Sequence, residues 1–462
     1  MLDNTSFFIL RETPEITYYV CNCPSVFLLE NFHSYFSKIF CIARSFTIIN
    51  SHTRLENASI INKIEPKMEQ MINVQVEDNS LSIENTLGPI SYISWLMGVG
   101  VARPRKCPKA VTIIIRIVHL AVCSIKLLLS LNLFLSHDAA YTFNDIYMSM
   151  YTINWVIFYM AAYYYVYNGI KQYDMWPELM DRLKDLDQKI RKEISMNDWP
   201  VKKIERLAIF ATFACCPLLL IVHALYYYFT RPEDIYASDL LLYYLLAQSL
   251  INSFVFNVIV YVLYYRFRTI NKLIDQLDRL SDASWFALKI RRIRELHNSV
   301  RVLVIMVNDI YGFHIFLCSA SCFTMVVTTL FKIYMSVQEK NYKFIILHNF
   351  LWILYITQFS LICRVCTLAR EESQRTGTFI YAFVLKCRNL DGDCVRNEVN
   401  DFSIQLQQYR VSFTACNFFE ISNALFTGFI VIITTNLIIL LQFYKAPDKL
   451  KNFFKTLSGI YT

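Results

Sequence analysis

The chain has 462 residues, of which 55% are hydrophobic and 18% are charged, and its mean hydropathy is +0.35. Soluble proteins carry more charge and less apolar sequence, so this composition excludes an ordinary soluble protein and predicts one that lies in a lipid bilayer. The formal net charge of +8 does not indicate a nucleic-acid partner, because the basic residues lie between apolar segments and form no basic domain.

The first part of the chain contains no spanning segment. Residues 1–84 hold short apolar clusters, none of which reaches spanning length without a charge. We therefore expect residues 1–109 to form a cytosolic or interfacial region. Residues 88–101 are moderately apolar but too short to span, which favours a membrane-surface or re-entrant segment. Gly98 and Gly100 lack the other residues of a dinucleotide-binding fingerprint and indicate a turn.

Seven later segments are apolar and long enough to cross a bilayer as helices. They cover residues 111–135, 146–167, 207–229, 240–265, a stretch within 302–331, then 344–363 and 421–443. We predict an all-α membrane protein with seven transmembrane helices over residues 110–445 and a short extracellular tail over 446–462.

The first predicted span contains unusual charges. Arg116 lies close enough to the predicted cytosolic end for its guanidinium to reach the interface. Lys126 lies deeper and needs a carboxylate, carbonyl or aqueous partner.

The distribution of basic residues predicts the orientation. The N-terminal region and the loops on its side contain 35 Lys and Arg residues, and the opposite side contains 8. Because cytosolic loops are enriched in Lys and Arg, the N-terminus is expected in the cytosol and the C-terminus outside the cell. This orientation is opposite to that of a G-protein-coupled receptor, and the characteristic Asp/Glu-Arg-Tyr and Asn-Pro-x-x-Tyr motifs are also missing.

The cytosolic connections carry apolar residues at helical spacing, which predicts helical extensions. These residues are Leu179, Leu183, Leu186, Ile190 and Ile194 after the second span; Ile270, Leu273, Ile274, Leu277 and Leu280 after the fourth; Ile290, Ile293, Leu296 and Val300 before the fifth; and Phe402, Leu406, Tyr409 and Phe413 before the seventh. Such stripes need apolar partners, either within the chain or in another subunit.

Aromatic and polar residues in the spans suggest a ligand site. The second span carries an aromatic residue at every fourth position from Tyr147 to Tyr167. This stripe can pack between helices or form a wall of a ligand site, and convergent aromatic faces with a few polar groups are typical of a small-molecule pocket. The candidate ligand-binding residues are Tyr151, Trp155, His223, Tyr227, Tyr244, Gln248, Asn252, Trp352 and Tyr355. For each residue alone, an interhelical contact is the alternative.

The last span is uncharged but contains polar residues, including Asn436 and Gln442. A polar group facing lipid costs free energy, so these residues are expected to face protein or water. They can line a water-filled path or form hydrogen bonds between helices.

The same segment carries a resemblance to a known family. Thr435-Asn436, five aliphatic residues and Gln442-Phe443 resemble the Thr-Tyr, five hydrophobics, Gln-Phe signature that closes the last helix of insect gustatory receptors. Asn436 departs from the pattern, since the family usually has tyrosine there. The preceding run from Phe413 to Phe419 is also similar, and the resemblance covers roughly residues 85 to 445.

The resemblance implies a tetrameric, tastant-gated, non-selective cation channel, as a homo- or hetero-oligomer with other gustatory receptors. It therefore favours contact between subunits for the apolar stripes of the helical extensions. It places such a channel in the plasma membrane of a chemosensory neuron, passing Na⁺, K⁺ and Ca²⁺. The candidate pore and gate residues are then Thr435, Asn436, Ile438, Ile439, Gln442 and Phe443. The signature lacks the acidic residue after its Thr position that sugar-sensing members tend to show, which favours bitter or other plant compounds.

An odorant receptor-type channel subunit and a multi-pass transporter are the alternatives; a transporter predicts an internal repeat that is not apparent. No catalytic motif occurs: HExxH, a phosphate-binding glycine-rich loop and GxSxG are all missing, so no enzyme is predicted. Cys363-x-x-Cys366 has no matching second pair in the sequence, and we expect no metal and no cofactor.

Overall fold

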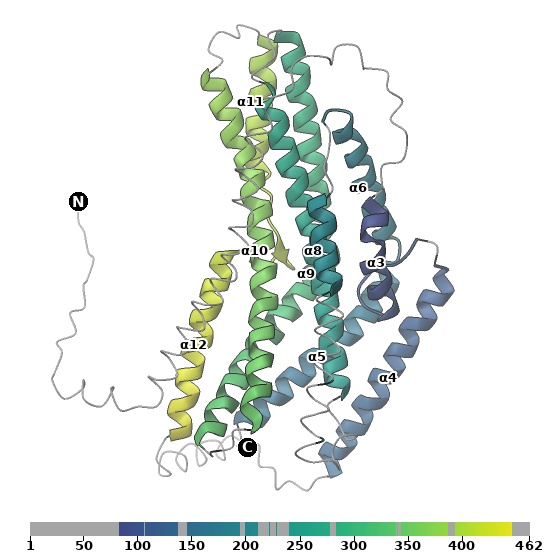
Figure 1. The fold of residues 1–462 in the computed structure, drawn as a ribbon, viewed down its shortest axis with the longest axis vertical. Helices are drawn as coiled ribbons and strands as arrows, with labels where there is room; N and C mark the ends of the chain where they lie inside the picture. The colour runs from purple at the N-terminus through teal and green to yellow at the C-terminus, as the bar shows by residue number, and fades with distance from the viewer. Residues whose placement is uncertain are drawn as a thin grey trace, which may run out of the picture. The chain divides into compact units, whose positions relative to one another are not determined.

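The structure is a computed structural model (Figure 1). It describes residues 83–105, 107–136, 146–194, 199–210, 221, 228, 240–277, 283–338, 340, 343–386 and 393–445. The chain divides into two units, Met1–Ser80 and Leu81–Thr462, and every described residue lies in the second. The predicted N-terminal region up to residue 82 and the predicted tail over 446–462 lie outside the described residues.

Helices dominate the described part of the chain. They are α3 (Ile83–Leu96), α4 (Lys109–Ser136), α5 (Ile146–Lys171), α6 (Met175–Arg191), α8 (Leu240–Asp275), α9 (Ala283–Gln338), α10 (Lys343–Lys386), α11 (Asp393–Gln408) and α12 (Asn423–Lys445), with a further helical stretch over 199–210.

Six of the seven predicted spans coincide with α4, α5, α8, α9, α10 and α12. The third begins in the stretch over 199–210 and mostly lies outside the described residues. Within the described residues, four helices are long and apolar enough to cross a membrane, namely α8, α9, α10 and α12. The count of seven transmembrane helices and the orientation of the two termini across the membrane stay predictions.

Helices α8, α9 and α10 form the centre of the fold and run side by side (Figure 1). Helix α9 has 56 residues, which at 1.5 Å per residue is about 84 Å, far more than the hydrocarbon core of a bilayer. The predicted extensions after the fourth span and before the fifth are therefore continuations of α8 and α9.

The apolar stripes on these extensions are buried within the single chain. Ile270 and Leu273 of α8 and Ile290 and Val300 of α9 are all fully buried. Helices α6 and α11 pack on α9, and α10 packs on α8. Intrachain packing, one of the two alternatives that the pattern left open, thus covers these faces without a second subunit.

A turn follows α3 and confirms the turn predicted at Gly98 and Gly100. These glycines have φ of 67° and 60°, left-handed values that glycine adopts without a steric penalty. The turn is not a surface loop, because Val99 and Val101 are at most 1% exposed. Residues after α3 therefore enter the interior of the helical packing.

Arg116 of α4 does not reach an aqueous interface, so that prediction is wrong. Its side chain is 1% exposed. Nη1 donates to the carbonyls of Gly98 and Tyr165 at 3.0 and 3.1 Å, and Nη2 donates to the carbonyl of Gly100 at 2.5 Å. Hydrogen bonds to three carbonyls replace hydration, which makes burial of the charge tolerable. The side chain of Lys126 lies outside the described residues.

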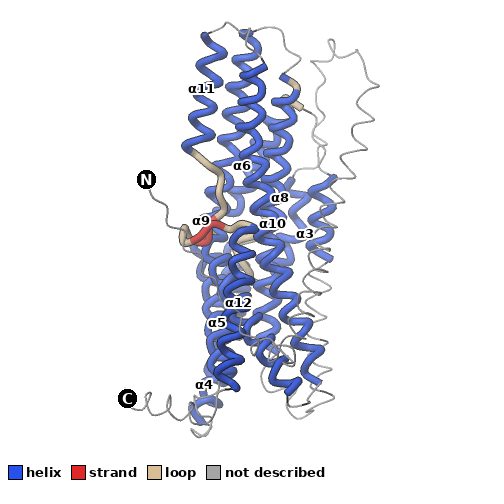
Figure 2. The backbone as a smooth tube through the Cα atoms, turned by 90° about the vertical axis from the view of Figure 1, so that its left-hand side faces the viewer, coloured by secondary structure: helices blue, strands red, loops and turns tan. Residues whose placement is uncertain are grey.

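A two-stranded antiparallel hairpin joins α11 to α12 (Figure 2). Its strands are β1 (Thr414–Ala415) and β2 (Phe419–Glu420). Cys416 and Asn417 in its turn have φ of 50° and 61°, a conformation that Asn tolerates better than most residues. The predicted stripe from Phe402 to Phe413 therefore does not form one helix. The described fold is all-α apart from this hairpin.

The hairpin is fixed to α9 and α10. Asn308 of α9 donates through Nδ2 to the carbonyl of Ser412 at 2.9 Å and accepts from the amide of Thr414 at 3.2 Å. Arg370 of α10 pairs with Glu420 at 2.6 Å. The two long helices thus determine where α12 begins.

Candidate functional site

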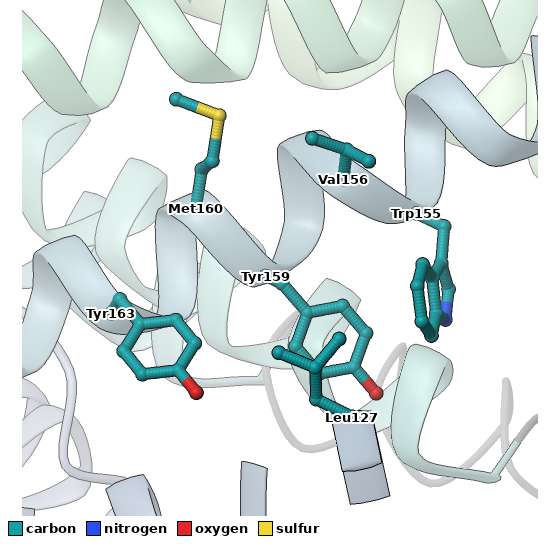
Figure 3. Close-up of a pocket in the computed structure, with 6 residues that line it drawn as sticks. All are labelled: Leu127, Trp155, Val156, Tyr159, Met160 and Tyr163. Atoms are coloured by element: carbon teal, nitrogen blue, oxygen red, sulfur yellow. The ribbon is translucent and has the colours of Figure 1, made fainter. Parts of the chain in front are cut away.

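The aromatic stripe of α5 lines a groove between α4 and α5. The groove has a volume of about 410 Å³ and is lined by Leu127 of α4 and by Trp155, Val156, Tyr159, Met160 and Tyr163 of α5. In Figure 3, the rings of Trp155, Tyr159 and Tyr163 extend from one side of α5 toward Leu127. This volume lies within the range of small-molecule sites.

The groove offers aromatic faces and very few polar atoms. Trp155 and Tyr159 meet edge to face, with ring centroids 4.7 Å apart. The hydroxyl of Tyr163 lies 2.9 Å from Ser124 Oγ and is therefore already hydrogen-bonded. Such a surface suits a flat, apolar molecule better than one with many hydroxyl groups.

Among the predicted ligand residues whose side chains the structure describes, Trp155 alone lines this groove. Tyr159 and Tyr163 belong to the stripe that the sequence revealed, but they were not among the candidates. No pattern in the sequence singled out Leu127, because its role depends on where α4 crosses α5. The side chain of Tyr151 and the residues His223 and Tyr227 lie outside the described residues.

The predicted residues of α8 face the turn after α3. Gln248 Nε2 donates to the carbonyl of Met97 at 2.8 Å and to the hydroxyl of Tyr244 at 3.1 Å. Asn252 lies against Gly100, where a Cβ would be 2.4 Å from Asn252 Oδ1. Gln248 thus holds backbone in place, and none of the three residues surrounds a described cavity.

His119 of α4 completes this polar cluster. Its Nε2 lies 3.2 Å from the carbonyl of Leu96, and its Nδ1 lies 2.5 Å from the hydroxyl of Tyr244. A carbonyl only accepts, so Nε2 carries the proton in the neutral ring and Nδ1 accepts from Tyr244. Residues of α3, α4 and α8 are thus linked through one histidine.

The predicted residues of α10 are buried among helices. Trp352 is 4% exposed and donates from Nε1 to Asn349 Oδ1 at 3.0 Å, and Tyr355 is 2% exposed. The structure therefore does not bring the candidates of α5, α8 and α10 together in one described pocket.

A second polar cluster, which the sequence did not single out, lies at the centre of the fold. The hydroxyl of Tyr165 is 2.9 Å from His314 Nδ1, and His314 Nε2 is 3.1 Å from Ser253 Oγ. Gln358 Nε2 donates to the same hydroxyl of Ser253 at 2.8 Å. The four residues come from α5, α9, α8 and α10, and their hydrogen bonds link these helices.

One face of α12 is exposed from Ala424 to Gln442. The exposed residues recur every three or four positions, which is one stripe on a helix. They are Ala424, Thr427, Gly428, Val431, Ile432, Thr435, Ile438, Ile439 and Gln442. Four of the candidate pore residues, Thr435, Ile438, Ile439 and Gln442, thus share this face. The side chain of Phe443 lies outside the described residues.

Asn436 lies off this stripe and is half-buried. Its Nδ2 donates to the carbonyl of Ile432 in the same helix at 2.9 Å. Where the family usually has tyrosine, the shorter Asn436 side chain therefore makes a hydrogen bond within α12.

The opposite face of α12 packs on the long helices. Phe429 lies between Phe323 of α9 and Phe359 of α10, with ring centroids 5.8 and 4.5 Å away. Ile433, one turn later, is 1% exposed. The amide of Asn423 donates to Thr367 Oγ1 at 2.9 Å. These contacts orient α12 so that its exposed stripe points away from the rest of the chain.

Known proteins share this fold. It is similar to the insect olfactory receptor OR5 from Machilis hrabei, with a TM-score of 0.51 and 13% identity, covering 78% of this chain and 98% of that one. The same receptor in complex with eugenol has a TM-score of 0.52 and 14% identity, covering 77% and 96%. At these identities the likeness concerns the fold alone.

In sequence, 104 residues are 30% identical to "Putative gustatory receptor 28b" of Drosophila melanogaster, and this match spans 22% of each protein. The model of the 7tm chemosensory receptor family matches residues 87–446. Because that match covers most of the chain and includes all the helices from α4 to α12, the chain belongs to the 7tm chemosensory receptor family of membrane proteins and is not an enzyme.

Proposed function

We propose that this protein is a tastant-gated, non-selective cation channel in the plasma membrane of a chemosensory neuron. Its subunits assemble as a homo- or hetero-tetramer, and α12 of each lines a central pore. The observation that carries the proposal is the exposed stripe of α12, on which Thr435, Ile438, Ile439 and Gln442 recur in a chain of the chemosensory receptor family.

The composition of the stripe supports ion conduction. Rings of Ile438 and Ile439 from several copies close a pore by dewetting, and a ring of Gln442 offers amide oxygens to a hydrated Na⁺, K⁺ or Ca²⁺ ion. The topology that goes with this arrangement has seven spans, a cytosolic N-terminus and an extracellular C-terminus.

The groove between α4 and α5 is the proposed tastant site. The olfactory receptor OR5 was solved with eugenol bound, which supports a small-molecule ligand for this chain too. Aromatic walls with one hydrogen-bonded hydroxyl favour a bitter or other plant compound over a sugar, because a sugar needs many polar partners.

Gating follows from the packing of α5. This helix contacts α8 and α9, and α9 contacts α12. A ligand that binds the open arrangement more tightly shifts the equilibrium toward it. The shift reaches the pore through Phe323 and Phe429, which join α9 to α12.

The pore is tested by replacing Gln442 with leucine. In cells that express the protein, Gln442→Leu is expected to change conductance or relative cation permeability at unchanged surface expression, since the ring of amide oxygens is lost. The matched control is Gln408→Leu, which removes an exposed glutamine from the end of α11. Unaltered permeation in Gln442→Leu removes this residue from the pore. Absence of ligand-evoked current in bilayers holding only this protein, across a tastant panel, contradicts the channel.

The groove is tested by Trp155→Ala. Loss of the indole removes a wall of the site, so the concentration of tastant for half-maximal current is expected to rise. The rise should be at least about tenfold, which is the order of magnitude expected when one buried aromatic contact is lost. Trp285→Ala is the control, because Trp285 is 59% exposed at the far end of α9. If Trp155→Ala and Trp285→Ala reach half-maximal current at the same tastant concentration, the ligand binds outside this groove.

The likeness to OR5, which covers 98% of that receptor, favours an odorant receptor-type channel subunit as the second candidate. Volatile compounds and tastants in the same current assay distinguish the two.

A further inference from the structure

Three basic side chains gather where α4 begins and α5 ends. Arg103 Cζ lies 3.7 Å from the ring centroid of Tyr173, and Lys109 Nζ lies 5.2 Å from the same ring. Lys171 Nζ lies 5.4 Å from the ring of Tyr167, one turn earlier in α5. Two tyrosine rings thus hold three cations at one end of the α4–α5 pair through cation–π contacts.

These positive charges have no acidic partner among the described residues. The neighbouring Arg105 differs, since it pairs with Asp181 at 2.5 Å. Arg103 is 7% exposed and its Nε donates only to the carbonyl of Tyr173, at 3.4 Å. A buried cation and two exposed lysines at the same end of the α4–α5 pair produce a local positive potential that attracts an anion.

An exposed apolar strip starts directly beside the cations. On α4 it contains Val111, Ile114, Ile117 and Val118, and on α5 it contains Tyr167 and Ile170, all between 38% and 60% exposed. Val111 and Val118 are about 10 Å apart along the helix. One leaflet of the hydrocarbon core is about 15 Å thick, so a single acyl chain can cover this strip.

We propose that this corner is a binding site for an anionic phospholipid. Its negatively charged headgroup contacts Lys109 and Lys171 beside Arg103, and one of its acyl chains lies on Val111, Ile114 and Val118. Charge complementarity selects an anionic lipid over a zwitterionic one, and the apolar strip selects a membrane lipid over a soluble anion. The site is separate from the groove at Trp155 and does not depend on channel activity.

The full chain, purified in detergent, tests the proposal with phosphatidylserine and phosphatidylcholine that carry the same acyl chains. Lipid bound per protein is measured by native mass spectrometry, together with the shift in thermal unfolding. Phosphatidylserine is expected to bind at least about tenfold more tightly. Lys109→Gln combined with Lys171→Gln should weaken that binding roughly 25-fold, since each lysine near an anionic surface contributes a factor of about 5.

The control is Lys184→Gln with Lys192→Gln, which removes two exposed lysines from α6 and its end and should leave lipid binding unchanged. Lys109→Arg with Lys171→Arg keeps both charges and should bind phosphatidylserine like the wild type. Normal binding by this variant shows that both positions tolerate substitution, so weaker binding by the glutamine variant reflects its lost charges and not misfolding. Equal binding of the two lipids, or undiminished phosphatidylserine binding in the glutamine variant, overturns the proposal. So does equal stabilisation by inorganic phosphate, because the site would then take a free anion.

Discussion

Arg116 shows how a single residue is accommodated where its charge should be costly. Its guanidinium contacts backbone carbonyls from the turn after α3 and from α5. The glycines beside it are required by geometry, since a Cβ on Gly169 would lie 2.1 Å from Cζ and Nη1 of Arg116. Small residues and a large buried cation therefore form one unit that joins α3, α4 and α5.

This unit predicts a strong effect of one methyl group. Gly169→Ala should push the guanidinium off its carbonyl partners and lower the midpoint of thermal unfolding by about 3–5 °C, because charged hydrogen bonds in the interior are lost. Gly88→Ala is the matched control, since nothing lies within 4 Å of a Cβ at Gly88 in α3. Differential scanning fluorimetry in detergent measures both, and equal midpoints would contradict the geometry.

At the scale of elements, ion pairs attach the outer helices to the long ones. Asp187 of α6 receives two hydrogen bonds from Arg266 of α8, at 2.6 and 2.9 Å. Glu193, just after α6, contacts Lys289 and Arg292 of α9, the latter at 2.5 Å. These pairs determine the position of α6 along α8 and α9.

Glu193 makes this attachment depend on pH. Burial raises the pKa of its carboxyl, but hydrogen bonds and the positive charges of Lys289 and Arg292 outweigh burial and leave the pKa below its usual value of 4.5. A carboxyl with a depressed pKa stabilises the fold above the unfolded-state pKa, and this contribution disappears as the pH falls through the folded-state pKa. The wild type should therefore exceed Glu193→Gln in thermal stability at pH 6, and the gap should shrink below about pH 4.5.

Asp185→Asn provides the comparison for this titration. Asp185 also pairs with a lysine, but its side chain is 61% exposed, and exposed pairs contribute little. The difference in thermal stability between the wild type and Asp185→Asn should be small at every pH. A gap for Glu193→Gln that stays constant from pH 6 to pH 4 would refute the assigned role.

For the whole molecule, α12 is the least buried of the four described helices that are long and apolar enough to cross a membrane. Only 6% of the apolar 18-residue stretch of α12 is buried within the chain, compared with 89% of the corresponding stretch of α8. A helix this apolar faces either lipid or other subunits, and its regular stripe of polar and aliphatic residues favours a shared interface.

Assembly through this face predicts cross-linking between copies. With Cys394 and Cys416 changed to serine, Ile439→Cys should react with a bifunctional maleimide to give dimers and larger species up to a tetramer, because Ile439 is 42% exposed on the stripe. Ile433→Cys, at a position 1% exposed against the same chain, should give no more cross-linked product than the same chain without an added cysteine. Denaturing gels after treatment of intact membranes report the result, and monomers from both variants would argue against a shared pore.

Much of this architecture was predictable from local pattern. Uninterrupted apolar runs identify helices that can enter a bilayer, and apolar residues at every third or fourth position identified the buried faces of α6, α8 and α9. The Gly98–Gly100 pair indicated a turn because glycine tolerates positive φ. The last helix and its family signature needed only residues 435–443, since both are properties of contiguous sequence.

Contacts between distant segments were decided by the tertiary structure alone. Tyr244 and Gln248 looked like ligand residues, yet Tyr244 donates to His119 of α4, and Gln248 donates to the carbonyl of Met97, 151 positions away in the chain. Leu127 became a wall of the groove because α4 meets α5 there. Helical periodicity tells which face of a helix is polar, but it does not tell which partner that face meets, because the partner depends on how separate helices cross in space.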